Sequence, residues 1–227
     1  MITLYDLPSK VADSPGTTTT WRARYCLNIK NLPYQTVYVE IPDVEAFAKE
    51  IGAAPTGMWP DRSPKYTLHG RPAYLDKTYP SCGPVLIPPG TMVLQLAFAD
   101  TVKEALEHLR LPLFYSYFVT KLNNRSAAPL RKKFGAKLEA PEGEEREKMW
   151  TMTRDNLGKM NEWFEGSEGD FVLGDEPCFA DTVISAIFRL IRSTVGKESE
   201  EWKDIATWHD GRWGKHLERF KQYEIVV

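Results

Sequence analysis

The strongest constraint on the fold is a change of pattern at residues 80–90, a segment with four prolines and two glycines. Before this segment, short apolar runs alternate with helix-like stretches, whereas after it apolar residues recur at helical spacing. A segment so rich in helix and strand breakers is typical of a linker. We therefore expect two domains, an α/β domain at residues 1–80 and an all-α domain at residues 91–227.

The first domain has the pattern strand, helix, strand, helix. Residues 2–5 form a short apolar run and residues 36–41 alternate between apolar and polar side chains, which indicates two strands. We expect a helix through residues 21–30 between them, and a second helix through residues 43–51 with Asp43 as its N-cap. Two strands joined by a helical crossover should pair in parallel.

The second domain consists of helical segments. The pattern predicts helices within residues 91–120, 144–165, 179–195, 198–208 and 214–222. The segment 179–195 is almost wholly apolar around its centre, so we expect it to be a buried helix.

Composition excludes several classes of partner. A net charge of −2 provides no strong field for nucleic acid, and no run approaches eighteen apolar residues, so we expect neither a nucleic-acid partner nor a membrane partner. The three cysteines are far apart and the four histidines lack ligand spacing, so no metal is expected. The first residues, MITLYDLPSK, lack a signal-peptide pattern. Free thiols suit a reducing compartment, and we expect a cytoplasmic protein.

Three stretches together resemble the glutathione transferase superfamily. They are ITLYD followed by WRARYCLN within residues 2–28, AYLDKTYP at 73–80, and FVLGDEPCFAD at 171–181. The chain is most similar to the β-etherase-like branch found in wood-degrading fungi and some bacteria, and residues 200–214 also resemble the fungal members. The resemblance implies a thioredoxin-like domain that holds glutathione and a helical domain that supplies most of the acceptor pocket.

The resemblance also implies where the glutathione sulfur lies. Such enzymes lower the pKa of the glutathione thiol, because the thiolate is the nucleophile. The sulfur-contacting residue of this branch is similar in placement to a serine four positions before Trp21, which is Thr17 here. Thr18 and Thr19 are neighbouring hydroxyls, and with Trp21 they complete the expected glutathione-binding set. A plain capping loop is an open alternative for this run of threonines.

Aromatic side chains of the second domain are candidates for the acceptor pocket. Tyr115, Tyr117, Phe118 and Trp150 lie on its first long helices and would suit flat hydrophobic ligands. Core packing is the open alternative for each of them. Asp181 and Cys178 occupy the positions of a helix-capping box, which we interpret as structural; a thiol is a weak partner in such a box.

The thioredoxin-like domain should also contain a β-hairpin before its last helix, and the sequence leaves no room for it. Only five residues separate Leu68 from Tyr74, too few for two strands and a turn. The expected cis-proline position falls on His69. Matching the flanks indicates that about twenty residues are missing. We therefore expect a truncated sheet and weak or absent glutathione binding.

Two main functions remain open. The first is a glutathione transferase for detoxification that conjugates or cleaves aromatic or ether-linked hydrophobic compounds with glutathione as co-substrate. The alternative is a non-catalytic, ligandin-like protein that binds hydrophobic aromatics. A third possibility is a splice or engineered variant that is chiefly a structural relic. The family resemblance implies a homodimer.

Overall fold

The computed structural model describes residues 1–10, 16–54, 57–58, 64–65, 72–109 and 114–227 of the chain. The predictions that concern Leu68 and His69 fall on residues outside these ranges. Among the described residues, every helix is too short or too polar to cross a lipid bilayer.

The first domain forms the predicted strand–helix–strand–helix unit. Its elements are β1 (Ile2–Asp6), α1 (Thr18–Ile29), β2 (Tyr34–Tyr38), the 3₁₀ turn η1 (Ile41–Asp43), α2 (Val44–Glu50) and α3 (Pro72–Thr78). The two strands pair in parallel as expected, with Ile2 opposite Tyr34 and Asp6 opposite Tyr38. The second strand begins two residues earlier than predicted, because the buried Tyr34 already pairs with β1.

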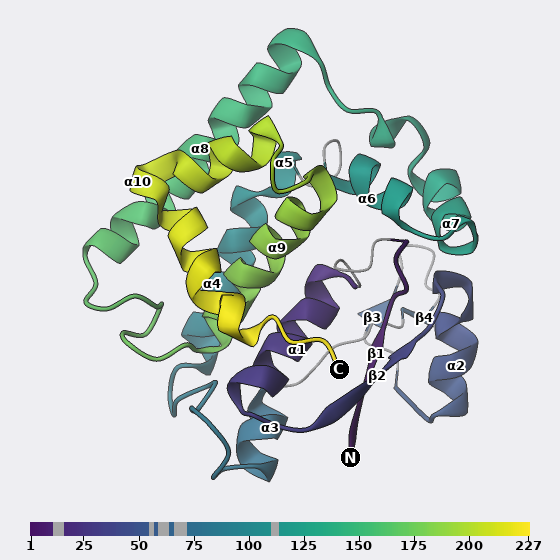
Figure 1. Ribbon diagram of the computed structural model, residues 1–227, viewed down its shortest axis with the longest axis vertical. Helices are drawn as coiled ribbons and strands as arrows, with labels where there is room; N and C mark the ends of the chain where they lie inside the picture. The colour runs from purple at the N-terminus through teal and green to yellow at the C-terminus, as the bar shows by residue number, and fades with distance from the viewer. Residues whose placement is uncertain (11–15, 55–56, 59–63, 66–71, 110–113) are drawn as a thin grey trace.

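The two faces of this sheet carry different helices (Figure 1). Side chains alternate along a strand, so neighbouring residues of β1 face opposite sides. Tyr5 packs edge-on against Phe47 of α2, with ring centroids 4.8 Å apart. Asp6 faces the other side and reaches Arg24 of α1. Helix α1 is therefore enclosed between the sheet and the helical domain.

A second pair of strands is separate from this sheet. β3 (Gly57–Met58) and β4 (Pro64–Lys65) pair antiparallel, and neither pairs with β1 or β2. The sheet formed by β1 and β2 thus has two strands within the described part of the chain, in line with the truncated sheet that we expected. The segment in which we expect the missing hairpin lies largely outside the described residues, so its absence stays a prediction.

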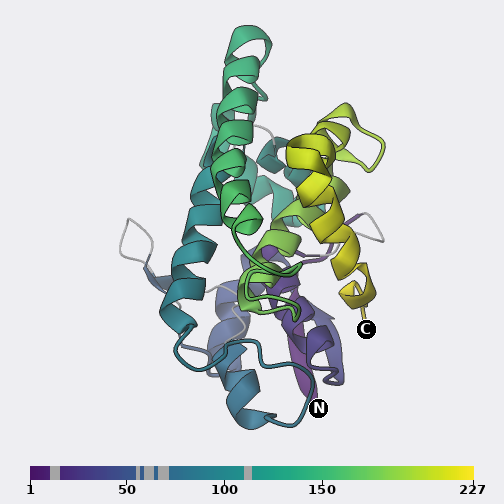
Figure 2. The same ribbon diagram turned by 90° about the vertical axis from the view of Figure 1, so that its left-hand side faces the viewer.

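The described part of the second domain consists of helices joined by loops, as predicted. Figure 2 shows α4 and α8 running along the molecule, with α10 on another side of the bundle. Helix α9 lies at the centre and contacts α1, α4 and α10. The helices are α4 (Met92–Ala105), α5 (Glu107–Leu109), α6 (Ser116–Lys121), α7 (Asn124–Phe134), η3 (Gly135–Leu138), α8 (Gly143–Glu165), α9 (Phe179–Val195), α10 (Glu200–Phe220) and η4 (Lys221–Tyr223).

Helices α6 and α7 leave the bundle and cover the end of β1 (Figure 1). A small core forms there from Leu7, Phe118, Val119, Leu122 and Ala127. The backbone of Lys10 donates to the carbonyl of Lys121 over 2.8 Å. The residues that follow β1 and the end of α6 are therefore held together, which brings part of the helical domain beside the end of β1.

Candidate functional site: the start of helix α1

Thr17 is the N-cap of α1, so the first helical residue is Thr18. Its extended backbone ends the preceding loop, and its hydroxyl accepts a hydrogen bond from the amide of Thr20 over 3.3 Å. The Thr20 hydroxyl accepts from the Thr17 amide over 2.8 Å, which completes a reciprocal capping box. The capping role that sequence left as an alternative is thus present. The two hydroxyls lie 3.4 Å apart, and the Thr20 hydroxyl donates to the Thr17 carbonyl over 3.1 Å, so the Thr17 proton can point either to the Thr20 oxygen or to a ligand.

Gly16, the residue before Thr17, is packed directly against the end of β1. Gly16 donates its amide to the carbonyl of Leu7 over 3.1 Å and has a φ of +95°. A Cβ at this position would lie 2.5 Å from the Thr20 hydroxyl and 2.6 Å from a carboxylate oxygen of Asp6. Only glycine fits there without displacing these groups. Asp6 therefore touches the backbone that places Thr17.

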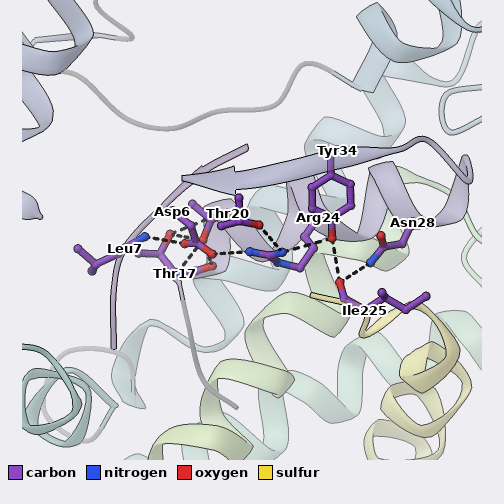
Figure 3. A network of polar contacts seen from close by, with 9 residues as sticks. Asp6, Leu7, Thr17, Thr20, Arg24, Asn28, Tyr34 and Ile225 are labelled. Carbon is purple, nitrogen blue, oxygen red and sulfur yellow. Dashed lines mark hydrogen bonds and ion pairs between the residues drawn. The ribbon is translucent and has the colours of Figure 1, made fainter. Parts of the chain in front are cut away.

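Asp6 is half of a buried ion pair. Its side chain and that of Arg24 are both 0% exposed, and the Arg24 guanidinium donates to Asp6 over 2.7 Å (Figure 3). The second carboxylate oxygen of Asp6 accepts from the amide of Leu7 over 2.8 Å. Both oxygens are engaged, so the pair fixes the end of β1 against α1.

The network continues from Arg24 toward the end of the chain (Figure 3). Arg24 also donates to the hydroxyls of Tyr34 and Thr36, over 3.2 and 3.1 Å. Tyr34 in turn donates to the carbonyl of Ile225 over 2.9 Å. A continuous chain of hydrogen bonds therefore connects Asp6 with the segment after α10.

Trp21 supports this region from inside the core. Its side chain is fully buried, and the guanidinium carbon of Arg189, from α9, lies 3.4 Å from the centre of its ring. Any contribution of Trp21 to glutathione binding is consequently exerted through packing. Thr18 and Thr19 are half-buried in the first turn of α1. The first amides of a helix lack partners within it, so this turn offers hydrogen-bond donors to an anion.

The buried cysteines are unsuited to act as nucleophiles. Burial raises the pKa of the Cys26 thiol to about 12. Burial, and then the charge of Asp181, raises the pKa of the Cys178 thiol as well. Both thiols are protonated near neutral pH, whereas nucleophilic cysteines have a lowered pKa. A thiolate at the start of α1 would have to come from a ligand.

The predicted acceptor-pocket residues do not form one group. Tyr115 packs edge-on against Phe118 and Phe134, with ring centroids 6.0 and 5.6 Å apart, in the part of the helical domain that covers β1. Tyr117, on α6, is exposed. Trp150 lies elsewhere, between α8 and α10: its indole donates to Asp204 over 3.1 Å and its ring packs edge-on against that of Trp208. The expected pocket residues are thus split between two places.

Asp6 and Arg24 are not among the site residues predicted from the sequence, although both lie in the stretches that carry the family resemblance. A signal was available in each case. Asp6 ends a buried strand, and Arg24 lies in a helix whose neighbouring residues, Ala23 and Tyr25, are buried. Charged residues are almost never fully buried unless they are paired. An aspartate and an arginine in two buried elements of one small domain could have been expected to pair.

A small sheet with a capped crossover helix, followed by a helical domain around one central helix, defines a protein of two domains, and the start of α1 is its candidate site. The family comparison identifies its class: the model of the glutathione S-transferase C-terminal domain matches residues 93–223. This chain belongs to the glutathione S-transferase family.

Solved structures agree with this assignment. A glutathione S-transferase of Ceriporiopsis subvermispora in complex with glutathione is 35% identical, covers 99% of this chain and 98% of its own, and has a TM-score of 0.89. A glutathione transferase of Phanerochaete chrysosporium is 29% identical, with coverages of 99% and 98% and a TM-score of 0.87.

The β-etherase LigF of Sphingobium sp. strain SYK-6 shares the fold at 15% identity, with coverages of 96% and 98% and a TM-score of 0.53. A comparison with the curated proteins gives no match. The resemblance to fungal glutathione transferases that the sequence indicated is confirmed.

Proposed function

We propose that this protein is a glutathione transferase in which the Thr17 hydroxyl stabilises the thiolate of bound glutathione. The observation that carries the proposal is the position of Thr17 as the N-cap of α1, with a half-buried hydroxyl whose proton can turn from the Thr20 oxygen, 3.4 Å away, to a bound sulfur. A structure with 35% identity holds glutathione, which supports glutathione as the co-substrate.

The chemistry follows from this position. The positive end of the α1 dipole and a hydrogen bond from Thr17 both favour the thiolate over the thiol, so the pKa of glutathione falls on binding. Glutathione releases its proton, the thiolate attacks an electrophilic carbon, and the leaving group departs with its bonding electrons. We propose hydrophobic aromatic or ether-linked compounds as acceptors, with the Tyr115–Phe118–Phe134 group, in the part of the helical domain that covers the end of β1, as their aromatic contact.

Replacing Thr17 tests this role directly. We expect Thr17→Ala to lower kcat/KM with a chromogenic electrophile by roughly ten- to hundredfold, the effect of one hydrogen bond to a charged group. Thr17→Ser keeps both the cap and the hydroxyl, so it should retain activity and serves as the matched control. Thr18→Ala and Thr19→Ala test the neighbouring hydroxyls. Equal activity of Thr17→Ala and the wild type, with both folded, would remove Thr17 from the mechanism.

The alternative is a ligandin-like protein that binds hydrophobic aromatics without turnover. The observation that favours it is the two-stranded β1–β2 sheet, since the expected missing hairpin would take hydrogen bonds to glutathione with it. Calorimetry with glutathione and titration with an aromatic dye separate the two functions. Tight dye binding, without glutathione binding in the micromolar range and without turnover, would favour the ligandin role.

Dimer formation and a cytoplasmic location belong to the same proposal. Helix α4 exposes Val93 and Leu94, at 76% and 68% of their surface, which supports a contact with a second copy through this face. Sedimentation of the purified protein as a monomer at micromolar concentration would contradict the homodimer. A role in detoxification would follow from broad activity toward aromatic electrophiles.

A further inference from the structure

We infer that residues 223–227, here called the tail segment, help to position Gly16 and Thr17, here called the Thr17 loop. The connection is a chain of hydrogen bonds that passes through side chains of β2 and α1. This inference rests on the proposed function, because it concerns the residue that we propose to contact the glutathione sulfur. It assigns positioning roles to Tyr34, Arg24 and Asp6.

The tail segment is anchored at defined points on the first domain. The side-chain amide nitrogen of Asn28, on α1, donates to the backbone carbonyls of Tyr223 and Ile225 over 2.7 and 2.9 Å. The Tyr34 hydroxyl donates to the same Ile225 carbonyl over 2.9 Å. The backbone of the tail segment therefore satisfies polar side chains from both α1 and β2 (Figure 3).

The side chain of Glu224 adds a charged anchor. Arg192 of α9 lies 2.8 Å from this carboxylate, and Arg189 lies 3.5 Å away. The Tyr25 hydroxyl, on α1, donates to it over 3.3 Å. Ion pairs at a partly buried site hold a segment more firmly than exposed pairs do. The tail segment is thus bound to the helical domain as well as to α1.

The path from the tail segment to the Thr17 loop contains no gap. Tyr34 accepts from Arg24, which donates to Asp6, and Asp6 binds the amide of Leu7. The Leu7 carbonyl accepts the amide of Gly16, the residue before Thr17. Because Arg24 and Asp6 are fully buried, water cannot replace a partner that moves. A shift at Tyr34 is therefore transmitted to Asp6 and to the loop.

The space around Asp6 explains why the loop would respond. An added Cβ at Gly16 would lie 2.6 Å from one Asp6 carboxylate oxygen and 2.8 Å from the other. Such close packing leaves a rotated carboxylate no room beside Gly16, the residue that precedes Thr17. The Thr20 hydroxyl borders the same space and belongs to the capping box of Thr17.

Two variants weaken the tail segment without touching the loop. Tyr34→Phe removes one oxygen and retains the ring, whereas Asn28→Ala removes both of the bonds that Asn28 donates. Tyr38→Phe is the matched control, since it makes the same substitution at an exposed position of the same strand. A melting temperature measured for each variant verifies that the fold is retained.

Hydrogen exchange of the Gly16 and Thr20 amides reports on the loop without requiring activity. We expect about fivefold faster exchange of these amides in Tyr34→Phe and Asn28→Ala, the factor that one net hydrogen bond supplies, and no change in Tyr38→Phe. Amides at the centre of α9 should exchange as in the wild type. Unchanged exchange of Gly16 and Thr20 in both variants would overturn the inference.

The pH dependence of kcat/KM shows whether the effect reaches the hydroxyl. We expect the apparent pKa of bound glutathione to rise by about half a unit in Tyr34→Phe, which lowers kcat/KM about threefold at pH values below this pKa. The KM for glutathione should change less than about twofold. Faster exchange with an unshifted pH profile would overturn the positioning role. A wild type without glutathione-dependent turnover would refute the proposed function, while the exchange result would still decide the coupling.

Discussion

Cys178 lies at an unusual position for a cysteine, directly before a buried helix. It is the N-cap of α9, where its thiol lies 3.0 Å from a carboxylate oxygen of Asp181 and its amide donates to the same oxygen over 3.0 Å. The other oxygen of Asp181 accepts the amide of Val172 over 2.9 Å. Asp181 thus ties the loop before α9 to the helix, in agreement with the structural role that we expected. A thiol makes weaker hydrogen bonds than a hydroxyl does.

We predict that Cys178→Ser stabilises the protein. The serine hydroxyl would donate to Asp181 more strongly and cap the helix better, which should raise the free energy of unfolding by about 0.5–1 kcal/mol and the melting temperature by about 1–4 °C. Thermal denaturation of the purified protein measures both. Cys82→Ser, at a partly exposed cysteine, is the control and should change stability by less than about 0.5 kcal/mol. Lower stability of Cys178→Ser than of this control would show that apolar packing of the sulfur matters more.

At the scale of elements, α1 and α3 are joined to the linker by one carboxylate. Asp76 of α3 accepts from the Lys30 ammonium over 3.0 Å and from the amides of Leu86 and Ile87 over 3.1 and 2.8 Å. Lys30 is fully buried at the end of α1. Gly83 packs so closely on Lys30 that a Cβ added at Gly83 would lie 2.6 Å from the Lys30 Cα. The proline-rich linker is therefore held in a defined path.

We predict that Asp76→Asn destabilises the fold by about 2–4 kcal/mol. The substitution keeps the shape of the side chain but leaves a buried ammonium without its counter-charge, and such half-broken pairs are costly. Chemical denaturation monitored by tryptophan fluorescence measures the change. Asp100→Asn removes the partner of Lys103 at an exposed site and should cost less than about 0.5 kcal/mol. Equal effects of the two substitutions would show that the Lys30–Asp76 pair contributes little.

The elements that sequence predicted well are those whose pattern is local. Helix α9 coincides with the predicted segment, because its apolar run and capping box both lie within a few residues. The helix expected within residues 91–120 is divided into α4, α5 and α6, a break that apolar spacing alone did not indicate. Asp43 is the N-cap of α2, but its carboxylate pairs with Arg125 of α7 instead of capping the helix. Such long-range partners leave no periodic signal.

The candidate site shows the same division. Thr17 was identified through the family resemblance, from its spacing to Trp21 in the sequence. The split between Tyr115 and Trp150 could not, since it depends on α6 and α7 leaving the bundle to pack on Leu7. The Asp6–Arg24 pair joins residues eighteen positions apart through tertiary packing. Sequence therefore identified the loop that holds the proposed hydroxyl, but not the groups that hold the loop.

At the scale of the whole molecule, α10 closes the helical domain around α9 through a buried histidine. The ring of His216 stacks on Phe220, with centroids 5.3 Å apart, and lies edge-on to Phe171 at 6.2 Å. One ring nitrogen lies 3.5 Å from the carbonyl of Asp181. His216 thus connects α10 with α9 and with the loop that precedes it. A charge on this ring would be placed in the core of the domain.

We predict that the stability of the whole fold decreases as the pH falls through 6.5 and that His216 accounts for much of the decrease. Burial lowers the pKa of His216 below its ordinary value of 6.5. The charge of Asp181 acts in the opposite direction and raises this pKa, whereas the charges of Arg219 and Arg212 lower it further. Below pH 6.5 the unfolded chain therefore binds a proton that the folded chain does not, and the free energy of unfolding falls until the folded pKa is reached. Above pH 6.5 the contribution is fully present.

Urea denaturation at pH 7.5 and pH 5.5 measures this contribution. From pH 7.5 to pH 5.5 the free energy of unfolding of the wild type should fall by up to about 1.4 kcal/mol more than that of His216→Gln. This is the amount that one histidine held neutral in the folded state supplies. His108→Gln, at an exposed histidine, should follow the wild type. His209, whose pKa burial also lowers, remains in all three proteins and cancels from the comparison. If His216→Gln and the wild type lose the same stability, the junction of α10 with α9 tolerates the charged ring, and the acid sensitivity of the fold must arise elsewhere.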